Sequence, residues 1–376
     1  MNELDSLLVL NAISGLGNRR IRRLLDDCGS ARGVLDLRHD QIIDGHSLLA
    51  KAVQKIKDFP KESFIDKEHH LMEKYRVEVL TYKDQDYPQN LKEIPDAPLV
   101  LYRKGVKPIQ DRLAIAIVGS RHATYYGLKM ADELAYGLAE RGICIVSGLA
   151  RGIDTAAHQG ALKCDGTTTA VLGCGLAHVY PPENKKLFEK LSESGAVYSE
   201  FPMMAPPMAR HFPQRNRVIS GLSLGVVVVE ASLRSGALIT SDFALEQGRE
   251  VFAVPGKADH HNASGVHRLI QQGAKLVTCV EDILEELAPD INGYLRDGYR
   301  PASAAKKRAA PITRELTQEE ETLLVRLNDE PRHIDALVQD ANVSISSIMP
   351  ILLKLELKQL VKQLPGKLFV RCSALN

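Results

Sequence analysis

The sequence predicts an α/β protein with a mostly parallel central sheet and helical segments at both ends. Between residues 76 and 288, short apolar runs of strand length alternate with stretches of helical periodicity. These runs are apolar at nearly every position, as expected for strands that helices cover on both faces. Outside this zone, apolar side chains recur at helical spacing. Alternating strands and helices favour parallel pairing with right-handed crossover connections.

The strands of the middle zone can be placed in order along the chain. Residues 113–119 form the first apolar run, and a helix follows from about 124 to 141, where Gly142 ends it. Two segments, 77–82 and 98–103, are expected as edge strands. The remaining strands of the parallel sheet are expected at 143–148, 168–175, 196–201, 224–231, 250–256 and 275–279.

The chain divides into four zones by composition. Its 376 residues suit two or three domains. Residues 1–75 are expected to form a helical N-terminal domain, residues 76–288 the sheet-containing core, and residues 315–376 a C-terminal helical domain. Residues 289–314 are rich in Pro, Gly, Ala and basic residues, which is typical of an exposed linker.

Composition excludes several classes of protein. The 48 Lys and Arg residues nearly balance 47 Asp and Glu residues, so the chain is no uniformly basic nucleic-acid coat, although a local basic patch is compatible with this balance. The first ten residues carry acids and no basic stretch, and no apolar run reaches the length of a membrane span. We therefore expect a cytoplasmic protein that makes no membrane contact.

The six cysteines are scattered and form no CxxC pair. Because a zinc site needs clustered ligands, we expect no structural metal, and we expect free thiols in a reducing compartment. No cofactor is expected either.

Glycine follows three successive strands of the expected sheet, and arginine follows two of them. Ligands of open α/β sheets bind beyond the carboxyl ends of the strands, where glycine lets a ligand approach the backbone and arginine suits phosphate. The alternative is that these segments are only tight turns, but three adjacent turns, two of them with arginine, favour an anion site. The residues concerned are Gly119, Ser120 and Arg121, then Ser147, Gly148, Arg151 and Gly152, then Gly173 and Gly175.

These turns match neither of the common nucleotide-binding motifs. The segment 119–124 lacks the second and third glycines of the dinucleotide fingerprint, and the chain has no G-K-[ST] sequence of a P-loop. The pattern therefore disfavours an enzyme that uses a nicotinamide cofactor or ATP.

A basic segment follows between residues 201 and 229. It contains no Asp or Glu, while Arg210, Arg215 and Arg217 give it a local charge of +3. Basic side chains for phosphates and an aromatic side chain such as Phe212 for base stacking are the minimum for binding single-stranded nucleic acid. Two alternatives stay open: Phe212 anchors a surface helix, and Asn216 and Arg217 are structural caps.

Other polar groups of the middle zone are assigned more ordinary roles. Ser235 and Gly236 open a helix whose first turn faces the crevice. Asp154 and His158 are four residues apart, which permits an acid–base pair, but a capping Asp within an ordinary polar pair is the favoured interpretation. We expect no catalytic residue.

Both ends of the chain carry features typical of DNA-binding modules. Near the N-terminus, the Gly-Leu-Gly sequence at 15–17 precedes a helix with four arginines, as in the hairpin of helix-hairpin-helix modules, although a solvated helix face explains these charges too. The C-terminal zone reads as three helices and a hairpin, the winged-helix pattern, with Thr317 and Glu320 as a capping box. Its second helix has no basic residue before Lys354, so a protein-contact role is the alternative.

Five motifs together resemble one family, the DNA-processing protein A family (DprA/Smf). They are GSRHATYYG, SGLARGIDTAAHQGAL, HFPQRNRVISGLS, SGALITSDFALEQGREVFAVPG and GVHRLIQQGA, in the family's order. The resemblance implies an extended Rossmann-like core, an N-terminal domain similar to sterile-alpha-motif or helix-hairpin-helix folds, and a C-terminal winged helix. It also implies a non-catalytic protein that binds single-stranded DNA, forms homodimers and loads the recombinase RecA during natural transformation.

The resemblance assigns roles to particular residues. Gly119, Ser120 and Arg121 correspond to the phosphate-contacting turn, and Phe212 to the aromatic position beside the DNA pocket. A basic residue usually precedes that aromatic residue, and Arg210 is the nearest candidate here because Ala209 is apolar.

Two other functions remain as alternatives. The first is a nucleotide-binding enzyme of the phosphoribohydrolase-like Rossmann class, although the segment RSGALIT at 234–240 lacks that class's double glycine. The second is a transcription factor that uses the winged helix.

Overall fold

The computed structural model describes residues 1–37, 47–106, 113–288, 316–327, 331–341, 343–358 and 360–371. They fall into two compact units. The first contains the N-terminal helices and a nine-stranded sheet, and the second contains the C-terminal helices and a three-stranded sheet. The linker predicted at 289–314 lies outside the described residues.

The nine-stranded sheet confirms the predicted α/β core. Its strand order is β1-β2-β6-β5-β4-β3-β7-β8-β9. Strands β3 to β9 pair in parallel, while β2 pairs antiparallel with β1 and with β6, so the two predicted edge strands do lie at one edge. The strands are β1 Val77–Thr81, β2 Val100–Gly105, β3 Ala114–Gly119, β4 Cys144–Ser147, β5 Thr168–Val171, β6 Ala196–Ser199, β7 Gly225–Val229, β8 Glu250–Val254 and β9 Lys275–Leu276.

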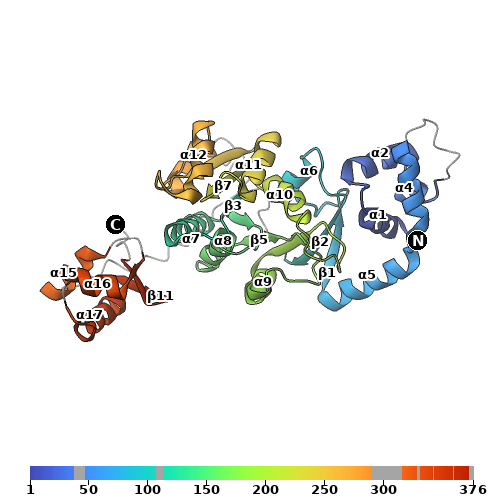
Figure 1. Cartoon of the computed structure of the whole chain (residues 1–376). Helices are drawn as coiled ribbons and strands as arrows, with labels where there is room; N and C mark the ends of the chain where they lie inside the picture. The colour runs from blue at the N-terminus through green and yellow to red at the C-terminus, as the bar shows by residue number, and fades with distance from the viewer. Residues whose placement is uncertain are drawn as a thin grey trace. The chain divides into compact units, whose positions relative to one another are not determined.

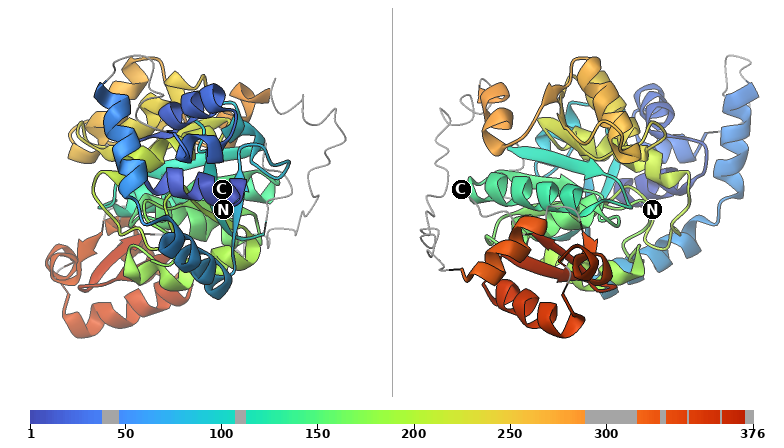
Figure 2. Two further views of the ribbon diagram at one scale, coloured as in Figure 1. Left: turned by 90° about the vertical axis from the view of Figure 1, so that its right-hand side faces the viewer. Right: turned by 60° about the vertical axis from the view of Figure 1, so that its left-hand side comes forward.

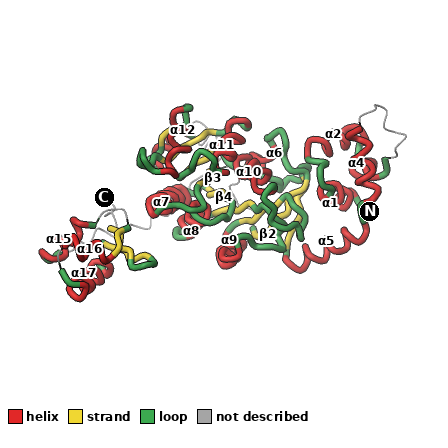
Figure 3. Tube along the Cα trace, in the orientation of Figure 1, coloured by secondary structure: helices red, strands yellow, loops and turns green. Residues whose placement is uncertain are grey.

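Helices cover both faces of this sheet. Figure 1 shows α7, α8 and α9 on one side and α10, α11 and α12 on the other, with the strands between them, and Figures 2 and 3 show the same layers. The parallel strands are therefore buried on both faces, as their continuous apolar sequences predict. The helices are α6 Gln89–Lys92, α7 Tyr125–Glu140, α8 Ile153–Leu162, α9 Lys185–Ser194, α10 His211–Gly221, α11 Gly236–Glu246, α12 Ser264–Gln271 and α13 Val280–Glu286.

The order in which the chain adds strands to the sheet reverses between β3 and β7. Starting at β3, the chain adds β4, β5 and β6 on one side, and then returns to place β7, β8 and β9 on the other. The loops that leave β3 and β7 consequently diverge, and a crevice opens at their carboxyl ends. The sequence predicts that a ligand binds in this crevice.

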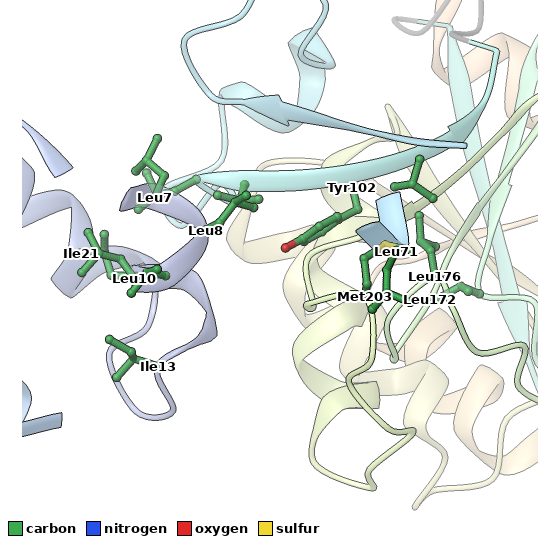
Figure 4. Close-up of a cluster of buried hydrophobic side chains, with 14 of the residues drawn as sticks. Leu7, Leu8, Leu10, Ile13, Ile21, Leu71, Tyr102, Leu172, Leu176 and Met203 are labelled. Carbon is green, nitrogen blue, oxygen red and sulfur yellow. The ribbon is translucent and has the colours of Figure 1, made fainter. Parts of the chain in front are cut away.

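The N-terminal helices pack on the sheet through one shared core. They are α1 Glu3–Ala12, α2 Asn18–Cys28, α3 Ala31–Leu35, α4 Ser47–Asp58 and α5 Lys61–Tyr75. Figure 4 shows part of this core, including Leu8 of α1 and Tyr102 of β2. The buried Glu68 carboxylate accepts hydrogen bonds from the Tyr102 hydroxyl at 2.7 Å and from the backbone N–H of Met203 at 2.8 Å. These bonds offset part of the cost of burying the carboxylate, because a buried polar group without a partner is costly.

The C-terminal unit is a winged helix, as predicted. Its elements are α15 Gln318–Arg326, β10 Arg332–His333, α16 Ile334–Ala341, α17 Ile345–Leu357, β11 Val361–Leu364 and β12 Leu368–Arg371. The predicted capping box at Thr317 and Glu320 is present. The second helix of the motif, α17, exposes the apolar side chains of Ile345, Met349, Leu353 and Leu357.

In the described part of the chain, no single helix combines the length and hydropathy needed to cross a bilayer; α16 and α17 meet that test only as a pair bent by 111°.

Some local predictions were wrong. The third strand was expected to reach residue 175, but β5 ends at Val171, and residues 173–175 form a loop. The N-cap of α8 is Gly152 rather than Asp154, which lies in the first turn. A helix was also expected to begin at Asn216 and Arg217, but α10 begins at His211 and these two residues lie in its middle.

Candidate nucleic-acid interface

The turn after β3 is built around a glycine that no other residue could replace. Gly119 is the last residue of β3 and is paired with Val229 of β7. A Cβ atom at Gly119 would lie 1.8 Å from the carbonyl oxygen of Val229. The chain then turns sharply, and the hydroxyl of Ser120 accepts a hydrogen bond from the backbone N–H of His122 at 3.1 Å. The turn leaves Arg121 exposed above the carboxyl end of the strand.

Arg121 is held by an aromatic side chain and by no acid. The central guanidinium carbon lies 5.0 Å from the centroid of the Phe212 ring, a cation–π contact. Within the described residues Arg121 forms no ion pair. An exposed, unpaired guanidinium keeps all its donors available for an anion, because a planar fork of five N–H groups suits phosphate.

The Phe212 ring is itself fixed in place. A Cβ atom at Gly173 would lie 2.8 Å from the ring, so only a glycine lets the ring sit there. The ring centroid of Tyr180 lies 5.6 Å from that of Phe212 on another side. Since Phe212 is half-buried among these groups, its clearest role in this structure is to support Arg121.

A cleft of about 630 Å³ opens beside this turn. It lies at the carboxyl ends of β3 and β7, where the order of strand addition reverses. Eight of the predicted site residues line it: Gly119, Ser120, Arg121, Phe212, Arg215, Asn216, Ser235 and Gly236.

A narrower pocket adjoins the cleft and shares Arg121, Phe212 and Arg215 with it. Three further predicted residues, Gly148, Arg151 and Gly173, line this pocket. The turns after β3, β4 and β5 thus meet at one site. Arg151 differs from Arg121 because its guanidinium is paired with the carboxylate of Glu183, and both groups are about half exposed. Such a surface pair is weak and can exchange for a phosphate.

Arg215 is a buried charge beneath the cleft. Its guanidinium donates hydrogen bonds to the carbonyl oxygens of Gly148, at 2.7 Å, and of Val171, so it ties together the ends of β4 and β5. Burial lowers its pKa to about 10, and the nearby Asp154 carboxylate opposes that shift. Arg215 therefore acts mainly as a positioning residue, although its side chain also lines the cleft.

Asp154 balances this charge from the other side. Its carboxylate accepts hydrogen bonds from the backbone N–H groups of Gly148 at 3.1 Å and Ala150 at 3.3 Å. Burial raises the pKa of Asp154, while Arg215 lowers it. The buried pair shapes the turn after β4, and Asp154, although only 6% exposed, lies in the lining of the cleft with its charge opposed by Arg215.

The opposite wall of the cleft comes from α10 and α11. The hydroxyl of Ser235 caps α11 by accepting a hydrogen bond from the Ala237 N–H at 3.3 Å. The amide of Asn216 donates to the Gly236 carbonyl at 3.1 Å and so joins the two helices. No atom lies within 4 Å of a Cβ built on Gly236, so a ligand can approach this wall closely.

Five predicted residues line neither pocket. Ser147 is fully buried and donates to the carbonyl of Ile117 at 2.7 Å. Cβ atoms at Gly152 and Gly175 would meet the carbonyl oxygens of Ser120 at 2.2 Å and Pro202 at 2.0 Å, so these glycines allow close packing of the loops. Arg210 is exposed at the start of α10, next to Ala209, which does line the cleft.

Arg217 is placed away from the cleft. Its guanidinium is buried against the carboxylates of Glu200 and of Asp96, the latter at 3.3 Å. The local charge of +3 that the sequence predicts is therefore not displayed to solvent: Arg215 and Arg217 are both buried, and only Arg210 is exposed. The alternative of a structural role is the better description of Arg217.

Asp154 and His158 do not form an acid–base pair. His158 is fully buried, and its Nδ1 lies 2.7 Å from the hydroxyl of Thr168. Burial lowers the pKa of His158 to about 3, so the ring is neutral. Over the described ranges, no three His, Cys, Asp or Glu side chains cluster closely enough to hold a metal ion.

Besides Asp154, four polar residues of the cleft were not predicted as site residues from the sequence: Tyr180, Ser232, Thr240 and Asn262. The amide of Asn262 donates to the carbonyl of His122 at 3.0 Å and so braces the turn after β3. Tyr180 could have been found, because it follows the glycines after the third strand. Thr240 and Asn262 carry no local signal, since only the fold brings them to the cleft.

Comparison with known proteins identifies the family. A family model described as DNA recombination-mediator protein A matches residues 78–288, and a model of the DprA winged helix domain matches residues 307–367. The first match alone spans more than half of the chain. The chain belongs to the DprA/Smf family. Its membership explains why the glycine turns and the winged helix occur together in one chain.

Relatives within this family cover most of the chain. Protein Smf of Escherichia coli K12 is 37% identical over 326 residues, which are 86% of this chain and 85% of that protein. The DNA processing protein DprA of Streptococcus pneumoniae R6 is 45% identical over 222 residues, 59% of this chain and 78% of that protein.

Two solved structures of family members resemble this one. The crystal structure of DprA from Streptococcus pneumoniae has a TM-score of 0.67 and 38% identity, and it covers 76% of this chain and 99% of its own. A structure of DNA processing protein A from Helicobacter pylori, described as giving insights into its unique single-stranded DNA binding mode, has a TM-score of 0.52 and 28% identity. It covers 57% of this chain and 97% of its own.

Proposed function

We propose that this protein binds single-stranded DNA in the cleft between the turn after β3 and the start of α11. The observation that carries the proposal is the exposed, unpaired guanidinium of Arg121, held by Phe212 above the glycine turn. The single-stranded DNA binding mode described for the Helicobacter pylori relative supports it.

The chemistry of the cleft favours a sugar–phosphate chain over a particular base sequence. Its polar lining consists of hydroxyl groups, amides, two arginines and the buried carboxylate of Asp154, with backbone exposed at Gly119 and Gly236. Such groups bind phosphates and do not distinguish bases. We therefore expect affinity that depends strongly on salt and weakly on sequence.

The test is a salt-controlled titration of single-stranded and duplex oligonucleotides with the full chain and the variant Arg121→Gln. Loss of a charge-assisted contact of about 1.5–3 kcal/mol weakens single-strand binding by roughly 10- to 100-fold. Removing one phosphate contact also reduces the salt slope by about 0.7. Lys190→Gln is the matched control, because Lys190 is an exposed cation of α9 outside the cleft lining. Equal affinities for the two variants, both folded, would exclude this site.

We propose further that the protein is a recombination mediator rather than an enzyme. In this role it protects incoming single-stranded DNA and loads RecA during natural transformation, as a homodimer in the cytoplasm. Membership of a family of recombination-mediator proteins supports this role. So does the state of the nearest acid and base: the Asp154 carboxylate is buried and accepts hydrogen bonds from two backbone amides, and His158 is fully buried and lines neither pocket.

The mediator role is tested by RecA assembly on single-stranded DNA coated with a single-strand-binding protein. Substoichiometric amounts of this protein should shorten the lag before RecA filaments form, and Arg121→Gln should not. Sedimentation of the full chain measures the homodimer. Release of free base or phosphate from nucleotides would instead support the phosphoribohydrolase-like alternative.

A further inference from the structure

A second basic surface lies at the rim of the sheet that carries the cleft. It is formed by Arg19, Arg20 and Arg23 of α2 and Lys55 of α4, all exposed, and is called the α2 basic surface below. Arg20 donates to the carbonyl of Gly15 at 3.0 Å, and Lys55 donates to the carbonyl of Ser14 at 2.8 Å. The loop between α1 and α2 is thus bordered by four cations.

Two of these four charges, Arg19 and Arg23, have no partner inside the described structure. Arg19 and Arg23 form neither an ion pair nor a hydrogen bond with any residue that the structure describes, and Arg23 does not pair with Asp27, four residues further along α2. The first turn of α2 holds two of the arginines and no acid. Because a helix N-terminus is itself positive, the helix dipole repels an exposed cation placed there. A solvated helix face gains nothing from this arrangement, whereas a polyanion would offset the repulsion.

Hydrogen bonds fix where this surface lies. Asn18, the first residue of α2, donates to the Glu200 carboxylate at 3.4 Å and accepts from the Leu99 N–H at 3.3 Å. Asn11 donates to the Glu200 carbonyl at 2.9 Å. Glu200 directly follows β6, which runs parallel to β5, β4 and β3. The start of α2 is therefore anchored at the carboxyl edge of the sheet, the edge that also carries the cleft.

The distance between the two sites suits a continuous strand. From β3 to β6 there are three inter-strand spacings of about 4.8 Å, or roughly 14 Å. The segment 203–210 follows β6 and leads to α10, and most of it is exposed, including Met204, Met208 and the unpaired Arg210. It offers apolar side chains for bases and one cation for a phosphate along the way.

We propose that the α2 basic surface is a second contact for the same single strand, which leaves the cleft, crosses the segment 203–210 and reaches Arg19 and Arg23. This inference rests on the proposed function of the cleft. It assigns to the N-terminal helices a share of the binding site rather than a purely structural task.

The test measures how affinity depends on the length of an oligothymidylate, for the full chain and for Arg19→Gln/Arg23→Gln. We choose lengths of about 4 and about 16 nucleotides, the two ends of the range of sites in single-strand-binding modules. The short strand fills only the cleft, so its affinity should not change. The long strand should lose two phosphate contacts, a decrease in salt slope of about 1.4, or roughly 25-fold at 0.1 M relative to 1 M salt.

Lys74→Gln/Lys190→Gln is the matched control with the same change in charge. Both lysines are exposed, and both lie towards the amino ends of the parallel strands, opposite the cleft. Lys74 precedes β1, whose first residue aligns through Lys104 with the start of β6. Lys190 lies near the end of α9, which precedes β6. This variant should bind both strands like the unaltered chain.

The outcomes separate the two proposals. Thermal melting first establishes that both double variants are folded. Equal effects of the two double variants on the long strand, or an equal loss for short and long strands, would overturn the second contact while leaving the cleft in place. A loss confined to duplex DNA would also overturn it. Failure of the unaltered chain to bind either single strand would instead overturn the proposed function itself.

Discussion

Replacing Arg217 by methionine should strongly destabilise the folded protein. The guanidinium of Arg217 is 5% exposed, and the carboxylate of its partner Glu200 is 4% exposed. Arg217 also donates to the carbonyl of Asp96 at 2.7 Å. Removing one member of a buried ion pair leaves the other charge uncompensated, which costs about 3–5 kcal/mol. One oxygen of Glu200, Oε1, already lacks a hydrogen-bond partner in the described structure, so the loss of Arg217 adds to an incompletely satisfied buried carboxylate.

The loss of stability should depend on pH. Burial raises the pKa of Glu200, and Arg217 opposes that shift, so the variant raises this pKa further. A carboxyl whose folded-state pKa lies above its unfolded value stabilises the fold below the unfolded pKa, and this contribution disappears as the pH rises through the folded pKa. The variant should therefore approach the unaltered chain in stability at acidic pH and differ most at neutral pH.

Urea unfolding of the full chain across this pH range measures the effect. The double variant Arg217→Met/Glu200→Gln is the control, since it removes both charges and should recover most of the loss. A decrease below about 1 kcal/mol, or one that is the same at acidic and neutral pH, would refute the interpretation of Arg217 as half of a buried pair.

Three further perturbations test the cleft and the winged helix. Gly119→Ala places a methyl group on the Val229 carbonyl and should abolish soluble expression, whereas Gly236→Ala, with open space around it, should fold normally, as circular dichroism will show. Phe212→Leu removes the support of Arg121, worth about 1 kcal/mol, and should weaken single-strand binding roughly fivefold; added to Arg121→Gln it should cost nothing more. Thr317→Ala should destabilise the winged helix by about 1 kcal/mol in hydrogen exchange, and unchanged protection of α15 would contradict the cap.

The sheet was predictable from the sequence because strands that are buried on both faces have continuous apolar sequences. A strand such as β7, with five consecutive buried residues, requires apolar residues or glycine at every position. The carboxyl ends of such strands, and therefore the place of the cleft, follow from chain direction alone. Strand boundaries were less predictable. Leu172 and Gly173 continue the apolar run of β5, yet they already belong to the loop that contacts the Phe212 ring.

The charges of the site were harder to predict. Arg210, Arg215 and Arg217 look alike in the sequence, but only the fold decides which of them is exposed. Arg215 and Arg217 find their counter-charges in Asp154 and Glu200, which lie on other segments of the chain. No local sequence pattern predicts such partners. A count of the arginines in the segment therefore overestimates the positive charge that is exposed to a ligand.

The reversal of the sheet at β3 also determines when the cleft comes into existence during synthesis. The turn after β3 is synthesised by Arg121, but the opposite wall requires α11, which begins at Gly236. More than a hundred further residues must leave the ribosome before the two walls can face each other. A nascent chain that already contains β3, β4 and β5 therefore carries the arginine turn without its opposing half, and the binding site is assembled late in translation.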